Sequence, residues 1–238
     1  MDVILPDLGV YDRPPLACRP GLTTVTDELT FRVILIALFI LLIDTRYYYA
    51  WRVSGPGDGI LVRLGISAGG GNREGNLSRA LISFFGSLAI TATLVYGIMP
   101  DWIEWGVVPM AAWLRWIGVG LSTGTVPLLL WVHYALDKNW SVGVVIRSGH
   151  TLISSGPYRW VRHPMYSAVL VWGAGFFLLS ANLVIGLLFF ATAVVAAASA
   201  AREEASLIEH FGDQYVAYME RTGRFLPRLG TVPRTNQL

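Results

Sequence analysis

The chain has 238 residues, of which 54% are hydrophobic and 14% are charged, and its net charge is +2. Because soluble domains average about 25% charged residues, this composition indicates a membrane protein, and the scattered basic residues argue against a nucleic-acid partner. The single cysteine, Cys18, and the four histidines, which form no HxxxH or HExxH pattern, predict neither an intrachain disulfide nor a metal site.

Residues 1–28 are predicted to form a polar N-terminal tail. Charged residues and prolines recur in this region, and it contains no apolar run of the length that a signal peptide needs. We expect a loose tail, or one that becomes ordered only on contact.

Five later stretches are long and apolar enough to cross ~30 Å of hydrocarbon, which takes about 20 helical residues. They run approximately over residues 29–50, 80–98, 110–136, 164–180 and 183–201. Only Ala181 and Asn182 separate the last two stretches, so these are expected to form a tight antiparallel hairpin. The sequence therefore predicts an all-α, polytopic membrane protein with about five transmembrane helices. Its divisions would be the tail, the first three helices (29–137) and a C-terminal region (138–238).

The distribution of Lys and Arg predicts the orientation in the membrane. The connections after the first and third stretches and the C-terminal tail hold several basic residues, whereas 101–109 and the hairpin turn hold none. Basic loops remain in the cytoplasm. With five spans, this pattern places the N-terminus outside and the C-terminus in the cytoplasm.

Polar and aromatic side chains are concentrated in two segments that flank the hairpin, 139–166 and 202–227. The hairpin returns the second segment close to the first, as a single site requires. Pro164 is suited to the first position of the fourth helix, where its missing N–H costs nothing. The free N–H groups and positive dipole of that end would favour a carboxylate. Aromatic side chains that could hold an adenine ring or a sulfonium surround this point: Tyr158, Trp160, His163 and Tyr166.

Glu203 and Glu204 follow the fifth stretch directly. Adjacent helical residues point about 100° apart, so at most one of them would face a given pocket while the other stays in water. A solvated helix end is the competing interpretation for this pair. Tyr215 and Tyr218, with Phe211, are interpreted as a face that lies on the bilayer rather than a binding site.

One carboxylate, Asp44, lies within an apolar stretch. A pair with Arg46 or Arg32 is favoured over a role in proton transfer, because charged groups inside a membrane usually pair with one another.

The string GHTLISSGPYRWVRHPMY (149–166), followed after the hairpin by EEASLIEHFGDQYVAYMERTGRFLP (203–227), resembles the isoprenylcysteine carboxyl methyltransferase family in a prokaryotic-type form. These are integral membrane enzymes that use S-adenosyl-L-methionine, and the resemblance makes 138–238 the catalytic region with a cytoplasmic cofactor site. The cofactor contacts that it implies are His150, Thr151, Leu152, Ile153, Tyr158, His163, Pro164, Met165, Tyr166 and Glu203. Ser199 departs from the pattern, because family members that act on prenylcysteine carry arginine there.

The implied reaction is methyl transfer to a lipophilic acceptor, with the carboxylate of an isoprenylcysteine-like substrate as the first candidate. Catalysis would depend mainly on positioning, with Arg202, Arg162 and Glu204 as the candidate catalytic residues. The membrane lipid and a lipophilic or prenylated substrate are the expected partners. A phospholipid amine or a small thiol is the alternative acceptor, and an NADPH-dependent sterol-type reductase is the alternative enzyme. Met165 argues against the reductase, whose similar motif has asparagine at this position.

Overall fold

The computed structural model describes residues 25–53, 73–136 and 151–228. These residues form the helices α1 (Val25–Val53), α3 (Arg73–Ile98), α4 (Ala112–Leu136), α5 (Pro164–Ser180), α6 (Leu183–Phe211) and α7 (Asp213–Arg221). Two short 3-10 helices, η2 (Pro100–Gly106) and η4 (Gly156–Arg159), lie between them. No β-strand occurs within the described residues, only isolated bridges, which confirms the predicted all-α class.

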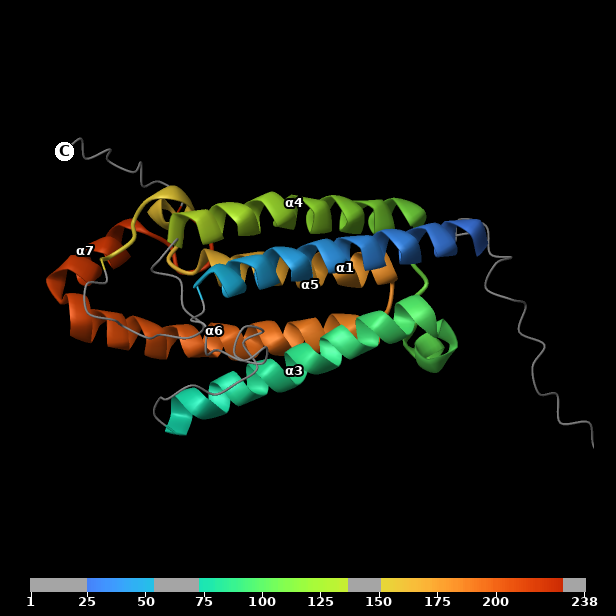
Figure 1. Ribbon diagram of the computed structural model, residues 1–238, viewed down its shortest axis with the longest axis horizontal. Helices are drawn as coiled ribbons and strands as arrows, with labels where there is room; N and C mark the ends of the chain where they lie inside the picture. The colour runs from blue at the N-terminus through green and yellow to red at the C-terminus, as the bar shows by residue number, and fades with distance from the viewer. Residues whose placement is uncertain (1–24, 54–72, 137–150, 229–238) are drawn as a thin grey trace, which may run out of the picture.

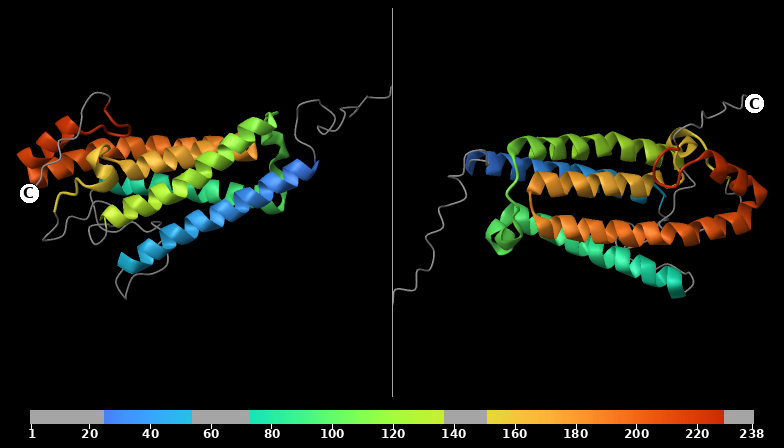
Figure 2. Two further views of the ribbon diagram at one scale, coloured as in Figure 1. Left: turned by 90° about the horizontal axis from the view of Figure 1, so that it is seen from above. Right: turned by 180° about the vertical axis from the view of Figure 1, so that it is seen from behind.

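Five long helices lie lengthwise in one elongated bundle, and α7 lies across one end of it (Figure 1). α5 packs on α4 and on α6, while α3 packs on the other side of α6. α1 packs on α4 and also contacts α3 and α5, and the view from above shows it beside α4 (Figure 2). The end of α4, the start of α5 and the end of α6 meet at the end of the bundle that carries α7. The two polar segments therefore lie together.

Three helical segments are long and apolar enough to cross a membrane: Ala80–Ile98, Ala112–Leu136 and Leu183–Phe211. α5 is apolar but has only 17 residues, about 26 Å at 1.5 Å per residue. α1 carries charged residues toward both ends, with none from 33 to 43. The polytopic character is thus present in the described helices, and the count of five spans stays a prediction.

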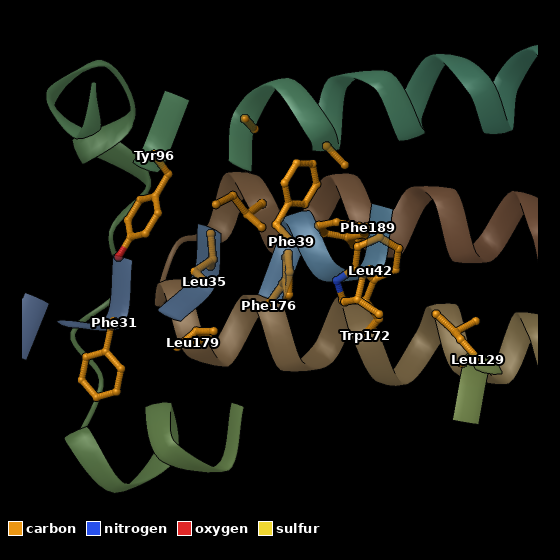
Figure 3. Close-up of a cluster of buried hydrophobic side chains, with 14 residues drawn as sticks. Phe31, Leu35, Phe39, Leu42, Tyr96, Leu129, Trp172, Phe176, Leu179 and Phe189 are labelled. Atoms are coloured by element: carbon orange, nitrogen blue, oxygen red, sulfur yellow. The ribbon is translucent and has the colours of Figure 1, made fainter. Parts of the chain in front are cut away.

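A cluster of buried aromatic and aliphatic side chains fills the middle of the bundle (Figure 3). Phe39 of α1 lies 6.3 Å from Phe176 of α5 between ring centroids, and Phe176 lies 5.8 Å from Phe189 of α6. Glycines bring the helix axes close enough for these contacts. A Cβ on Gly173 would lie 2.8 Å from the Phe189 Cβ, so the glycine allows α5 and α6 to pack this closely.

The turn between α5 and α6 is as tight as the sequence predicts. Ala181 adopts a left-handed conformation with φ 49°, and Asn182 caps α6 by accepting hydrogen bonds from Val184 N (3.0 Å) and Ile185 N (3.4 Å). The Asn182 side chain also donates to the carbonyl of Ile103 in η2 at 2.9 Å. The hairpin turn is therefore attached to the connection between α3 and α4.

The described part of α1 includes the last residues of the predicted polar tail. α1 begins at Val25, and Glu28 in its first turn forms an ion pair with Arg115 of α4, which is only 2% exposed. Tyr96 of α3 also donates to Glu28. A buried guanidinium needs an anionic partner, and a carboxylate suits the N-terminal end of a helix. Both effects draw Glu28 into the bundle, whereas residues 1–24 lie outside the described ranges.

Candidate active site

α5 begins at Pro164, as predicted, and His163 is its N-cap residue. No side chain of the described residues caps this end of the helix. The C-terminal segment after α7 runs beside the approach to α5: Arg162 N donates to Gly223 O at 2.8 Å, and His163 N donates to Arg224 O at 3.0 Å. These bonds fix the start of α5 against the C-terminal segment.

Glu204 is buried at the centre of a group of cationic side chains. Its carboxylate accepts from Arg162 Nε at 2.8 Å and from Arg224 Nη2 at 2.5 Å. His163 Nε2 lies 3.3 Å from the same carboxylate. Arg162 also donates to the carbonyl of Thr222 at 2.5 Å. We call Glu204, Arg162 and Arg224 the ion-pair cluster. The expectation that one of the two glutamates stays in water is wrong for Glu204, because it is buried as the partner of the buried Arg162.

Glu203 points to a different set of neighbours. Tyr166 of α5 donates its hydroxyl to Glu203 Oε1 at 2.5 Å, and His163 Nδ1 lies 3.6 Å from Glu203 Oε2. The Glu203 side chain remains 26% exposed. The 100° separation of adjacent residues thus gives the two carboxylates separate surroundings: one is enclosed by arginines, and the other is accessible beside an aromatic pair.

That aromatic pair consists of His163 and Tyr166, whose rings stack at 5.4 Å with an interplanar angle of 6°. Burial lowers the pKa of His163 to about 4, against the opposing effect of Glu204. The imidazole is therefore neutral near pH 7, with one N–H donor and one acceptor nitrogen. Phe225 of the C-terminal segment closes the far side of the imidazole at 5.9 Å.

The structure brings together five of the predicted cofactor contacts: His163, Pro164, Met165, Tyr166 and Glu203. The other predicted contacts precede these residues in the chain. Tyr158 is buried in η4. The segment before η4 holds Thr151, which is exposed, and Leu152 and Ile153, which are half-buried. His150 lies outside the described residues.

Tyr215 and Tyr218 are buried within the protein, so the interpretation that they lie on the bilayer is wrong. Tyr218 donates its hydroxyl to the carbonyl of Tyr158 at 2.7 Å. α7 turns back at Gly212 and lays these tyrosines on the loop that leads to α5. Through the Tyr218 hydroxyl, α7 is attached to this loop.

Arg202, a predicted catalytic candidate, is exposed on α6. Its guanidinium donates to the hydroxyl of Ser78 on α3 and to Ser199 Oγ at 3.4 Å. The cation therefore lies beside position 199, where the family pattern has arginine.

Sequence reasoning missed Arg224 and Arg46. Arg224 lies 20 residues after Glu204 in the chain and completes the ion-pair cluster. The two residues meet only because the chain turns back at α7. Arg46 of α1 directs Nη1 to Met165 Sδ at 3.9 Å. The predicted pair of Asp44 with Arg46 does not form within the described residues, since Asp44 is exposed and Arg46 turns inward to α5. In the sequence, the one sign of a role for Arg46 was its position as a charged residue within an apolar stretch.

Comparison with known proteins shows what part of this chain is similar to. The sequence model of the isoprenylcysteine carboxyl methyltransferase (ICMT) family matches residues 118–209. The Mus musculus protein named protein-S-isoprenylcysteine O-methyltransferase is 35% identical over 79 residues, which are 33% of this chain and 28% of the mouse protein. The protein of the same name in Schizosaccharomyces pombe is 34% identical over 85 residues, covering 33% of this chain and 34% of the yeast protein. The matches thus span about a third or less of these relatives.

The fold is also shared with a solved structure. The eukaryotic intramembrane Ras methyltransferase, isoprenylcysteine carboxyl methyltransferase, matches with a TM-score of 0.58 and 18% identity, over 84% of this chain and 67% of that chain. The shared fold and the long apolar helices identify an integral membrane protein. The predicted resemblance is therefore confirmed over residues 118–209, which match the model of the isoprenylcysteine carboxyl methyltransferase family.

Proposed function

We propose that this protein is a membrane methyltransferase that moves a methyl group from S-adenosyl-L-methionine to a lipophilic acceptor, with the carboxylate of an isoprenylcysteine-like molecule as the first candidate. The observation that carries the proposal is the arrangement of Glu203, Tyr166 and His163 at the uncapped start of α5. These three residues lie within residues 118–209, which the family model matches.

The residues at this place fit the cofactor. The start of α5 offers backbone N–H groups and a positive dipole end to a carboxylate. Glu203 offers an accessible acceptor for hydroxyl or amino groups. The proposed contacts are those predicted: His150, Thr151, Leu152, Ile153, Tyr158, His163, Pro164, Met165, Tyr166 and Glu203.

S-adenosyl-L-methionine supplies, when bound, a methyl group on a positively charged sulfur. A neutral His163 would add no second positive charge to the site that holds this group. A carboxylate acceptor arrives deprotonated, so no side chain of the protein has to remove a proton from it. The work left to the protein is to orient the two molecules and to exclude water.

The three predicted catalytic candidates then take different roles. Glu204 and Arg162 bind one another and the C-terminal segment, so they position the start of α5 rather than contact the reacting groups. Arg202 is exposed and would attract acidic molecules to this end of the bundle. The apolar part of the acceptor would remain in the bilayer, with its polar end at the cytoplasmic face.

The test uses the purified chain in lipid nanodiscs. Calorimetry with S-adenosylhomocysteine and with NADPH should show binding of the first alone. Radiolabelled methyl transfer should then be measured with N-acetyl-S-farnesylcysteine and with a phosphatidylethanolamine as acceptors. We expect the farnesylcysteine to be labelled. Binding of NADPH without S-adenosylhomocysteine would support the reductase, and labelling of the amine alone would replace the carboxylate acceptor.

A further inference from the structure

Arg46 is the basic side chain that α1 directs toward the start of α5. Its Nη1 donates to Met165 Sδ at 3.9 Å, and the guanidinium is close enough to Tyr166 and His133 to interact electrostatically with both. Met165 and Tyr166 are proposed cofactor contacts, and Tyr166 is bonded to Glu203. Arg46 therefore approaches the candidate site from the side of α1, whereas Glu203 approaches it from α6.

The partners of Arg46 do not match its charge. A thioether sulfur is a weak hydrogen-bond acceptor, and a guanidinium has five N–H donors. Among the residues that the structure describes, no carboxylate lies within 4.0 Å of Arg46. Two other arginines of the bundle differ from the half-buried Arg46: Arg115 is paired with Glu28, and Arg162 with Glu204.

The neighbours of Arg46 hold it in a defined position. Its neighbour His133 is held by a hydrogen bond of Nδ1 with the Leu129 carbonyl at 2.7 Å. Tyr49, one turn along α1, stacks on the His133 ring at 4.7 Å. These contacts fix α1 on α4 and hold Arg46 beside α5. An ionised side chain inside a membrane helix marks a functional site more often than a packing position, because its desolvation must be offset by a partner.

We infer that Arg46 binds the anionic group of the acceptor, which is a lipophilic molecule with a terminal carboxylate. This inference rests on the proposed function and adds a specificity-determining residue to it. The planar fork of a guanidinium matches two carboxylate oxygens, whereas a neutral ester offers it neither the charge nor the bidentate geometry. Methylation of the carboxylate removes its charge, so the ion pair with Arg46 is lost in the product and release of the ester is favoured.

The test measures acceptor binding in the absence of cofactor. Calorimetry in nanodiscs compares N-acetyl-S-farnesylcysteine with its methyl ester. The parent should bind the acid about ten- to a hundredfold more tightly than the ester, as for the loss of one charged hydrogen bond. Arg46→Gln should bind the acid only as well as the ester, with an unchanged affinity for the ester. Arg46→Lys, which keeps the charge and loses the fork, should retain part of the preference.

The controls separate this inference from the proposed function. Arg52→Gln removes an exposed arginine from the same helix and should keep the parent's preference for the acid. S-adenosylhomocysteine should bind the Arg46 variants as it binds the parent, which also shows that they are folded. Equal binding of acid and ester by the parent would overturn the inference. So would an undiminished preference in Arg46→Gln and Arg46→Lys, or a loss of preference in Arg202→Gln but not in Arg46→Gln. Failure of the parent to bind S-adenosylhomocysteine would instead overturn the proposed function.

Discussion

At the residue scale, the two adjacent glutamates at the end of α6 differ in what their removal should do. Glu203→Gln keeps the hydrogen bond from Tyr166 and loses the accessible charge. We expect its affinity for S-adenosylhomocysteine to fall about ten- to a hundredfold, with little change in the melting temperature, because one charged hydrogen bond is worth about 1.5–3 kcal/mol. Calorimetry and thermal unfolding measure the two quantities.

Glu204→Gln is the matched comparison, because it leaves Arg162 buried without its anionic partner. Breaking a buried ion pair costs about 3–5 kcal/mol, so this variant should unfold at a clearly lower temperature than the parent. If Glu203→Gln bound as tightly as the parent while Glu204→Gln remained stable, the division of roles between the two residues would be contradicted.

His163 should make the stability of the protein depend on acidity. Burial lowers its pKa from 6.5 to about 4. The unfolded chain therefore binds more protons than the folded protein between these values, and stability is lost as the pH falls from about 6.5 toward 4. The decrease in melting temperature from pH 7 to pH 5 should be larger for the parent than for His163→Asn, which lacks the titrating group. Equal drops would show that His163 carries no such linkage.

At the scale of elements, the α4–α5 contact depends on Gly118. A Cβ there would lie 2.5 Å from the Leu179 nitrogen and 2.7 Å from the Gly175 oxygen, both backbone atoms that cannot turn away. Gly118→Ala should therefore separate the helices and destabilise the fold by about 1–3 kcal/mol. Gly120→Ala is the control on the same helix, because no atom lies within 4 Å of its Cβ position. Thermal unfolding of both variants tests this, and an equal effect would contradict it.

The sequence predicted the helices and the turn from local residue properties. It could not predict contacts between side chains that are distant in the chain. Pro164 begins α5 and Ala181–Asn182 make the turn, because both depend on backbone properties of the residue itself. The environment of Glu204 depends instead on Arg224, which reaches it only after α7 has turned back at Gly212. Helical spacing shows that two adjacent carboxylates diverge but not which one meets an arginine. The burial of Tyr218 was missed for the same reason.

At the scale of the whole molecule, the two ends of the bundle are built differently. One end carries the ion-pair cluster, the start of α5 and α7. At the other end, Glu28, Tyr96 and Arg115 join α1, α3 and α4 by a buried ion pair and hydrogen bonds. The hairpin turn and η2 lie at that same end, attached through Asn182 and Ile103. The candidate site therefore lies at one end of the bundle, and a junction of three helices fixes the other end.

This polarity leads to a prediction about orientation. η2 exposes Trp102 and Trp105 at the end away from the start of α5, as interfacial tryptophans do, and the connection of 101–109 contains no Lys or Arg. Reporter fusions at Asp58, Arg147 and Leu238 should therefore report the cytoplasm, and a fusion at Trp105 the opposite side. The first three positions follow the basic connections and the basic C-terminal tail, so all should change together if the protein were inverted. A cytoplasmic Trp105 alongside a cytoplasmic Arg147 would mean that α4 does not cross the membrane, and the five-span arrangement would be wrong.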